Sequence, residues 1–281
     1  MATVDAWLCP NCKAETLTPF CAQCGERPIK RQDLTFRGVA ARLLHFATSV
    51  DGRWLGSAWK LLRHPGTLTL AYMEGSRKPH TPPFQLFLVA NVFFFATQSL
   101  TGINIFGSSL DSHLHQQDWS ALAQTLLDQR LASTHRSLEQ YTPVFDRAAV
   151  LNAKSLVILM VMPFALLLPL VFFGRHRPFM AHLVFSLHLH AFLMLLFCVA
   201  VLAAGVDVLA GGGGLKSPVV DNVLSVINFA ACAVYLYAAV GTAYGTAGWM
   251  RVAKVAVLTT AVSAAVVGYR FVIFVITLYA T

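Results

Sequence analysis

The sequence of this chain has few charged residues. Only 12% of its 281 residues are Asp, Glu, Lys or Arg, about half the share in an average soluble domain. Hydrophobic residues make up 56% of the chain. From Pro82 onward they gather into runs of roughly 18 to 28 residues, which is the length of membrane-spanning helices. A soluble globular domain is therefore a poor description of this sequence.

Several catalytic and ligand-binding motifs are also missing. The sequence has neither a Gly-x-Ser-x-Gly turn nor a Walker-type phosphate-binding loop. No Asp or Glu lies in the middle of an apolar run, which argues against a carboxylate-based proton or cation transporter and against an intramembrane metalloprotease. These absences favour a protein that is not an enzyme.

A cleavable signal peptide is missing as well. Residues Met1 to Cys9 include Asp5 and have neither a basic segment nor an apolar one, so we expect the N-terminus to stay in the cytoplasm. The chain shows no internal repeat or inverted symmetry of the kind from which two-fold transporter folds are built.

Five apolar runs predict membrane-spanning helices and an all-α polytopic fold. The predicted spans are residues 83–100, 152–173, 180–205, 219–243 and 252–279. Pro163 and Pro169 are expected to kink the second span. Together the spans form a transmembrane domain over residues 83–281.

The charges of the loops predict the orientation. The outer loop, residues 101–150, carries more acids than bases, whereas segments 174–179 and 244–254 carry bases and no acid. Because basic loops stay in the cytoplasm, the N-terminus is predicted inside and the C-terminus outside. A helix from Trp119 to Leu131 is expected in the outer loop, which would fold over the outer face of the spans.

Four of the six cysteines form two Cys-x-x-Cys pairs. Cys9 and Cys12 make the first pair, and Cys21 and Cys24 follow after eight residues. Two residues between cysteines let both thiolates reach one ion, and four thiolates complete the closed tetrahedron of a structural zinc site. The sequence therefore predicts a zinc ribbon over residues 1–26, whose folding depends on the metal.

The alternative for these cysteines is a pair of disulfides, which a reducing cytoplasm disfavours. The expected use of the ribbon is contact with a cytoplasmic protein partner. Lys30 and Arg31 lie nearby, but the membrane surface explains them as well as nucleic acid does, so no specific nucleic acid is expected. Cys198 and Cys232 fall inside predicted spans, where a buried cysteine is ordinary packing.

Residues 27–82 form a basic linker with amphipathic segments. Apolar residues recur at helical spacing from Phe36 to Ala47, and tryptophans and leucines alternate with bases from Arg53 to Arg63. Such helices lie on an anionic lipid leaflet or pack on the cytoplasmic face of the spans. The sequence leaves both arrangements open.

Polar residues inside the spans form a candidate intramembrane site. Its members are His182, Ser186, His188 and His190 of the third span and Arg270 of the fifth. At about 100° per residue, His182, Ser186 and His190 share a face while His188 points away, so the three histidines cannot chelate one metal alone.

Two uses of these residues remain open. In the structural use, the histidines make interhelical hydrogen bonds, each contributing on the order of 1 kcal/mol. In the functional use, the histidines and Arg270 line a polar cavity, and Arg270 meets an anionic lipid or substrate group. A haem or metal site would need further ligands from another helix.

Several motifs occur in a fixed order along the chain. They are Cys9-Pro10-Asn11-Cys12, Cys21-Ala22-Gln23-Cys24-Gly25, Leu62-Arg63-His64-Pro65-Gly66, Gly75-Ser76-Arg77, Pro82-Pro83-Phe84-Gln85-Leu86-Phe87, Met162-Pro163-Phe164-Ala165-Leu166-Leu167-Leu168 and the run from His182 to Phe192. The ordered set resembles a bacterial family of zinc-ribbon membrane proteins of unknown function, in which a four-cysteine ribbon precedes a multi-span helical domain. The resemblance implies a bacterial inner membrane and a periplasmic C-terminus. It implies no reaction.

The leading hypothesis is a non-enzymatic inner-membrane protein of unknown activity whose ribbon is a cytoplasmic protein-interaction or sensing module. A second hypothesis is a small permease or lipid-handling protein in which the intramembrane histidines and Arg270 line one cavity. A third is a membrane protein that holds haem or a metal through its histidines.

Overall fold

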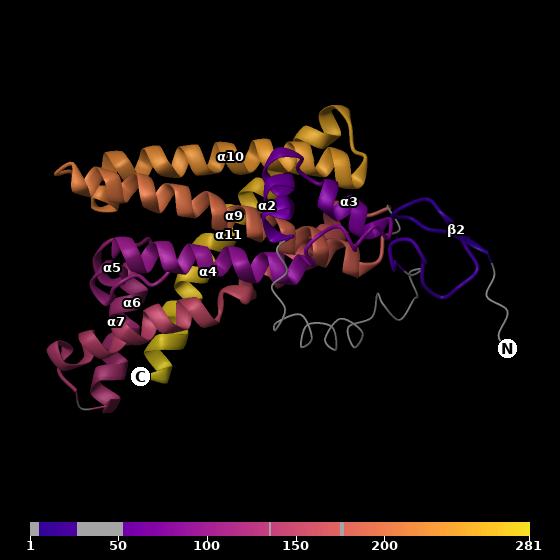
Figure 1. Cartoon of the computed structure of the whole chain (residues 1–281). Coiled ribbons are helices and arrows are strands. Elements are labelled where there is room, and N and C mark those ends of the chain that lie inside the picture. The colour runs from indigo at the N-terminus through magenta and orange to yellow at the C-terminus, as the bar shows by residue number, and fades with distance from the viewer. Residues whose placement is uncertain (1–5, 27–52, 135, 175–176) are drawn as a thin grey trace.

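The computed structural model of the protein describes residues 6–26, 53–134, 136–174 and 177–281. In these residues one short hairpin precedes a bundle of helices (Figure 1). The elements are β1 (Trp7–Leu8), β2 (Glu15–Thr16), α2 (Trp54–Arg63), α3 (Thr67–Met73), α4 (Pro83–Thr101), α5 (Leu110–His115), α6 (Ser120–Thr134), α7 (Leu138–Ser155), the 3-10 helix η2 (Val157–Met160), α8 (Val161–Val171), α9 (Phe179–Leu209), the 3-10 helix η3 (Gly214–Lys216), α10 (Pro218–Tyr244) and α11 (Gly248–Ala280). The helical part of the predicted fold class is confirmed.

Four helices of the described chain, α4, α9, α10 and α11, are long and apolar enough to cross a membrane. Their bounds agree within a few residues with the first, third, fourth and fifth predicted spans. α9 and α11 have 31 and 33 residues, more than the roughly 20 needed to cross the hydrocarbon core. The count rises to five if the bent pair of Leu138–Ser155 and Val157–Val171 is one span.

The second predicted span, residues 152–173, is the one from which the structure differs most. α7 ends at Ser155, η2 follows, and the two parts differ in direction by 58°. Pro163 lies in the first turn of α8 and Pro169 in its interior, so this bend precedes both prolines. A proline in the first turn has no intrahelical hydrogen bond to remove, which explains why Pro163 does not set the bend.

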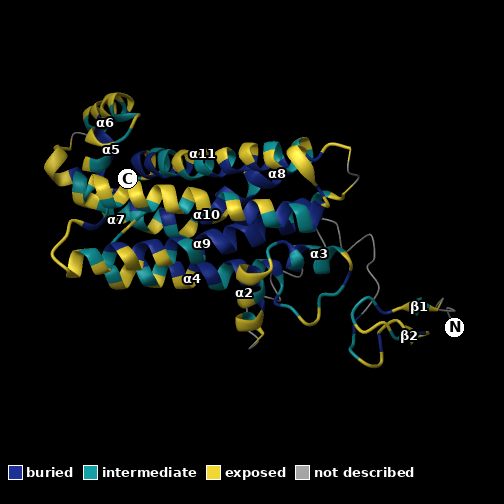
Figure 2. Cartoon of the chain, turned by 90° about the horizontal axis from the view of Figure 1, so that it is seen from above, coloured by how far each residue is buried: buried dark blue, intermediate teal, exposed yellow. Residues whose placement is uncertain are grey.

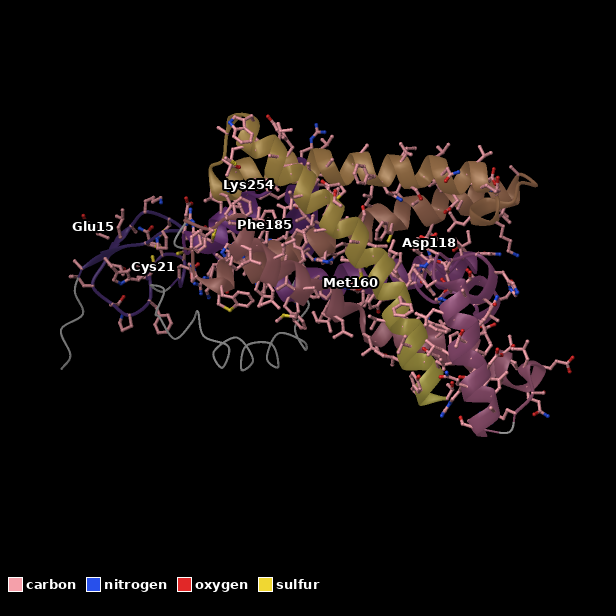
Figure 3. The ribbon with its side chains drawn as sticks, turned by 180° about the vertical axis from the view of Figure 1, so that it is seen from behind. Glu15, Cys21, Asp118, Met160, Phe185 and Lys254 are labelled. Atoms are coloured by element: carbon pink, nitrogen blue, oxygen red, sulfur yellow. The ribbon has the colours of Figure 1, made fainter. Side chains whose placement is uncertain are left out.

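The two ends of the bundle carry different structures. The hairpin lies at one end, beside a short-helix region that we call the platform, residues 54–82, comprising α2, α3 and the segment that leads to α4 (Figure 1). α5, α6, α7 and the C-terminus lie at the other end, and Figure 3 accordingly places Cys21 and Asp118 far apart. The helix predicted from Phe36 to Ala47 lies outside the described residues.

α9 is the central helix of the bundle. Between residues 180 and 194 every side chain except that of Leu183 is buried, as the dark-blue half of α9 shows in Figure 2. α4, α8, α10 and α3 all pack against it. The far half of α9 is more open, with Val199 and Val206 about two-thirds exposed. The platform end of the bundle is therefore the tightly packed end.

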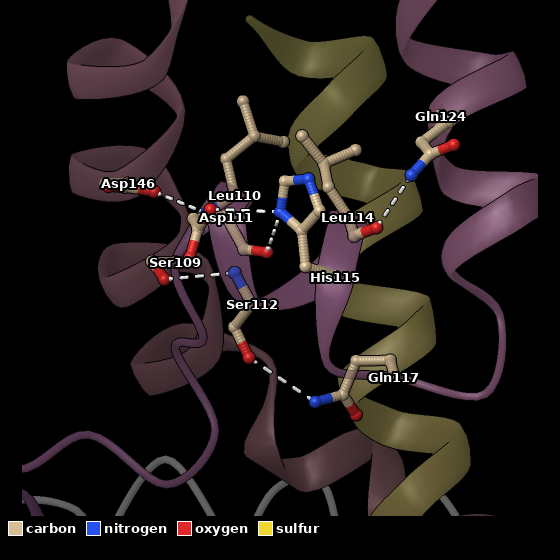
Figure 4. A network of polar contacts seen from close by, with 9 residues as sticks. All are labelled: Ser109, Leu110, Asp111, Ser112, Leu114, His115, Gln117, Gln124 and Asp146. Carbon is tan, nitrogen blue, oxygen red and sulfur yellow. Dashed lines mark hydrogen bonds and ion pairs between the residues drawn. The ribbon is translucent and has the colours of Figure 1, made fainter. Parts of the chain in front are cut away.

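The predicted outer loop, residues 101–150, contains α5, α6 and most of α7. These helices share a second apolar cluster with the last turns of α11, in which Tyr141, Phe145 and Phe274 are fully buried. Figure 4 shows polar contacts that hold α5 in place. At the start of α5 the Ser109 hydroxyl accepts a hydrogen bond from the backbone N–H of Ser112. The Asp146 carboxylate accepts one from the backbone N–H of Leu110.

Gly66 sets the position of the platform on the bundle. It caps α3 with φ +84°, and a Cβ atom there would lie 2.6 Å from the carbonyl oxygen of Ala239 in α10. A side chain at this position would therefore be strained by the backbone and blocked by α10. Gly102 has a similar φ of +70° but open space around it.

These two glycines provide a matched pair for a stability measurement. Gly102→Ala adds only the cost of a left-handed alanine, about 1–2 kcal/mol, whereas Gly66→Ala also pushes α3 away from α10 and should cost roughly 1–3 kcal/mol more. The free energy of unfolding in mixed micelles measures both. Equal losses in the two variants would contradict the close approach of α3 to α10.

Candidate metal centre and polar contacts

The hairpin at the N-terminus places two turns of the same construction beside each other. β1 and β2 pair antiparallel. In the first turn, the N–H of Lys13 donates to the Cys9 carbonyl and the N–H of Cys9 to Ala14. In the second turn the N–H of Gly25 donates to the Cys21 carbonyl in the same way as Lys13 does to Cys9. Lys13 has a φ of +60° and Gly25 a φ of +68°. Each turn therefore closes through a left-handed residue four positions after its first cysteine.

These turns bring the four predicted ligand thiols together. The sulfur atoms of the four cysteines all lie within 4.8 Å of one another. Those of Cys9 and Cys24 are 3.5 Å apart. Tetrahedral zinc with bonds of about 2.3 Å separates its sulfur ligands by roughly 3.8 Å, whereas a disulfide needs about 2.05 Å. The cluster therefore has the geometry of a site for one metal ion, and the four cysteines are free thiols.

Hydrogen bonds lower the pKa of two thiols of the cluster, Cys21 and Cys24, whereas the side chain of Cys21 helps to raise the pKa of Cys12 to about 12. Hydrogen bonding from the backbone of Cys24 lowers the pKa of the Cys21 thiol to about 6. The side chain of Asn11 is the largest cause of a lowered pKa for Cys24. Because metals bind the deprotonated form, these bonds favour the metal-binding form of Cys21 and Cys24.

The hairpin is attached to the platform through polar contacts. One carboxylate oxygen of Glu26 accepts hydrogen bonds from the backbone N–H groups of Arg77 and Lys78, both at 3.0 Å. The Ser76 hydroxyl donates to the side-chain oxygen of Asn11 at 3.0 Å. Glu26 is only 4% exposed, so this carboxylate is a buried part of the contact. Sequence reasoning treated Ser76 to Lys78 as a connector and missed this role.

Two of the histidines predicted in the third span bond residues of different elements. The Nδ1 atom of His182 lies 2.9 Å from the hydroxyl of Tyr244 at the end of α10. The Nδ1 atom of His188 lies 2.8 Å from the hydroxyl of Thr69 in α3. The two histidines therefore connect α9 to two different elements at its platform end.

Ser186 and His190 lie on the side of α9 that faces α8. The Ser186 hydroxyl donates to the carbonyl of Val161 at 2.8 Å, and the Nδ1 atom of His190 lies 2.8 Å from the Ser186 carbonyl. The ring of Phe164 meets His190 edge to face. The predicted separation of His188 from the face of the other polar residues agrees with these partners.

Arg270 lies toward the opposite end of the bundle from the three histidines of α9. Its guanidinium donates to the hydroxyl of Ser108, at 2.9 Å from Nη2. The structure thus does not bring Arg270 into one cavity with His182, His188 and His190 in the part of the chain that it describes.

A pocket of about 120 Å³ lies between the platform and α9. His188 is the one member of the predicted intramembrane site that lines it. Its other polar lining comes from residues that sequence reasoning did not select, among them Arg77, His80 and Thr81. The sequence signal for these residues is weak, because they lie between Gly75 and Pro82 in a stretch whose composition is typical of a turn.

Comparison with known proteins gives one match. Residues 51–95 match the model of a family described as a protein of unknown function (DUF3667). The matched segment contains α2, α3, the residues that contact the hairpin and most of α4. No curated protein and no solved structure matches the chain. The comparisons therefore add no activity, and they direct attention to the platform.

His113 of α5 is a buried histidine near Arg270. The indole N–H of Trp119 donates to its Nδ1 atom at 3.3 Å, and its ring lies 4.8 Å from that of Phe274. Burial, followed by the charge of Arg270, lowers the pKa of His113 to about 4. The folded protein therefore keeps this imidazole neutral.

The stability of α5 and the helices packed around it should consequently depend on pH. An unfolded histidine has a pKa of about 6.5, so the unfolded state binds a proton between pH 6.5 and 4 that the folded state does not. Stability is present above pH 6.5 and is lost as the pH falls toward 4. We expect Tm to fall over this range and the fall to shrink in His113→Phe. Exposed His115 provides the control, and an undiminished fall in His113→Phe would contradict this role.

Proposed function

We propose that this chain is a multi-pass protein of a bacterial inner membrane whose zinc-bound ribbon is a cytoplasmic protein-interaction or sensing module. The N-terminus is cytoplasmic and the C-terminus periplasmic. The ribbon acts on the spans through the platform. Four to five helices of sufficient length and the four-cysteine cluster support this proposal, as does the resemblance of the ordered motifs to zinc-ribbon membrane proteins.

The orientation is supported by charges at the two ends of the bundle. Bases gather at the platform end, with Arg177 in the loop before α9 and Arg251 and Lys254 in the first turns of α11, whereas the acidic segment lies at the other end. Positive loops mark the cytoplasmic side. The platform therefore lies at the inner leaflet.

α2 supports contact with an anionic leaflet. It runs across the direction of the long helices in Figure 1. Leu55, Trp59 and Leu62 are 47 to 63% exposed on one side of α2, and Lys60 and Arg63 lie in its last turn. An apolar face with basic neighbours is typical of helices that lie in a membrane interface. Residues 53–82 both pack on the spans and present this face outward.

The observation that carries the proposal is the bond of Glu26 to the platform. Glu26 comes two residues after the ligand Cys24, and its carboxylate caps the backbone N–H groups of Arg77 and Lys78. A small module without a core of its own folds only with its metal. Zinc binding or a protein partner that moves the ribbon would therefore change the restraint on residues 76–78.

The metal itself is tested by zinc content. Cys24→Ser removes a ligand, so we expect the purified variant to lose the zinc that the unchanged chain carries at one ion per chain, as measured by inductively coupled plasma mass spectrometry. Cys232→Ser, inside α10, is the control and should retain zinc. Membrane insertion should persist in both variants because the spans insert on their own hydrophobicity. Full zinc content in Cys24→Ser would contradict the site.

The connection between ribbon and platform is tested by hydrogen exchange. Glu26→Ala removes the acceptor of two backbone N–H groups, so amide exchange in a peptide covering residues 76–81 should accelerate about fivefold or more, as expected for a lost bond of roughly 1 kcal/mol or more. Removal of zinc by a chelator should do the same. Glu74→Ala, on the exposed surface of the platform, is the control. Unchanged exchange after both treatments would show that the ribbon does not restrain the platform.

A further inference from the structure

The pocket between the platform and α9 has a mainly apolar lining. Its walls come from α3, from the segment that leads into α4 and from the first turns of α9. The apolar side chains that line it are Leu68, Tyr72, Pro82, Pro83, Phe84, Met180, Leu183, Val184 and Leu187. One ordered water needs roughly 10–15 Å³ of cavity, so about 120 Å³ holds a group of roughly ten non-hydrogen atoms.

Polar atoms without partners lie in the wall of this pocket. Thr81 is 4% exposed, and its hydroxyl finds no hydrogen-bond partner among the described residues. The Nε and Nη2 atoms of Arg77 are buried and likewise unpaired within the described chain, while the guanidinium lies 4.7 Å from the centre of the Tyr72 ring. Buried donors without acceptors cost free energy. A ligand with oxygen acceptors would remove this cost.

The charge around the pocket has one sign. Arg77 lines it, and the ammonium of Lys60 lies 3.3 Å from the Nε2 atom of His80, another lining residue. No acidic side chain lines the pocket within the described residues. Glu26 is the acid that contacts residues 77–78, and its carboxylate accepts hydrogen bonds from the backbone N–H groups of Arg77 and Lys78. The complementary ligand group is an anion.

We propose that this pocket binds the anionic head of an amphiphile, a phosphate or carboxylate carried on an alkyl chain. Arg77 and Thr81 donate hydrogen bonds to the oxygens of the head, and the first carbons of the chain pack against Leu183 and Leu187. Arginine is suited to this role because its planar fork binds two oxygens at once. An apolar pocket with a few convergent polar groups is the usual form of a site for a small molecule.

The location of the pocket agrees with this ligand. Met180 and Leu183 are in the first turns of α9, at the end of the bundle where the proposed orientation puts the inner leaflet. Lipid head groups of that leaflet lie at the same depth. The proposal deepens the lipid contact proposed for the platform by naming a site distinct from the outward face of α2.

Direct binding measurements test this site. The full chain in phosphatidylcholine nanodiscs is titrated with radiolabelled dodecyl phosphate, dodecanoate or dodecanol, and empty nanodiscs provide the background. We expect saturable binding of one or both anions at least about tenfold tighter than that of dodecanol, as charge-assisted hydrogen bonds predict. Preference for the phosphate assigns the site to a phospholipid, and preference for the carboxylate assigns it to a fatty acid. Equal binding of all three would overturn the proposal.

Three variants locate the binding. Arg77→Met keeps a long side chain over Tyr72 but removes the charge, so anion affinity should fall about tenfold or more. Leu183→Trp fills the pocket and should reduce binding of every probe. Arg63→Met is the control, because Arg63 also lies near an aromatic ring, that of Trp59, but on the exposed surface of α2. Tm is measured for each variant to identify any that misfold.

The outcomes separate the pocket from the rest of the platform. Native affinity in a folded Arg77→Met variant would overturn the proposal. A loss confined to Arg63→Met would assign binding to the outward face of α2 and would also overturn the pocket, while leaving the interfacial contact of the proposed function intact. Zinc content measured on the same samples shows whether the ribbon is intact in each comparison.

Discussion

The arrangement of the bundle depends on the need of buried polar groups in α9 to find hydrogen-bond partners. An unpaired polar group in an apolar interior costs several kcal/mol. Three polar groups in the buried half of α9 therefore each bond a neighbouring element. His182 meets the hydroxyl of Tyr244, Ser186 meets the carbonyl of Val161, and His188 meets the hydroxyl of Thr69. α10, α8 and α3 are thereby placed around one helix.

The contact to α3 extends this constraint beyond the long helices. Thr69 fixes α3 against α9, and Gly66 lets the start of α3 approach α10 closely. The segment after α3 then presents the backbone N–H groups that Glu26 binds, and it contributes Arg77 and Thr81 to the pocket. The four-cysteine hairpin and the pocket are thus both supported by the same few turns of the platform. If both proposals hold, metal binding to the cysteines and a ligand in the pocket act on one segment.

Much of this architecture could be predicted from the sequence. Long apolar runs located α4, α9, α10 and α11, and cysteine spacing located the four-thiol cluster, because both depend on residues close together in the chain. The break after Ser155 could not be predicted, since hydropathy does not report direction. The partners of His182 and His188 are 62 and 119 residues away, so helical spacing could show only which face each occupied. The pocket arises from turns that had no periodic pattern.

The attachment of the platform to α9 is the central claim, and a double-mutant cycle tests it most directly. Thr69→Val and His188→Phe, singly and together, are compared by free energy of unfolding in mixed micelles. The structure predicts a coupling energy of roughly 1 kcal/mol, within the range measured for hydrogen bonds between membrane helices. Additive losses, within about 0.3–0.5 kcal/mol, would contradict the claim that this bond holds α3 on α9.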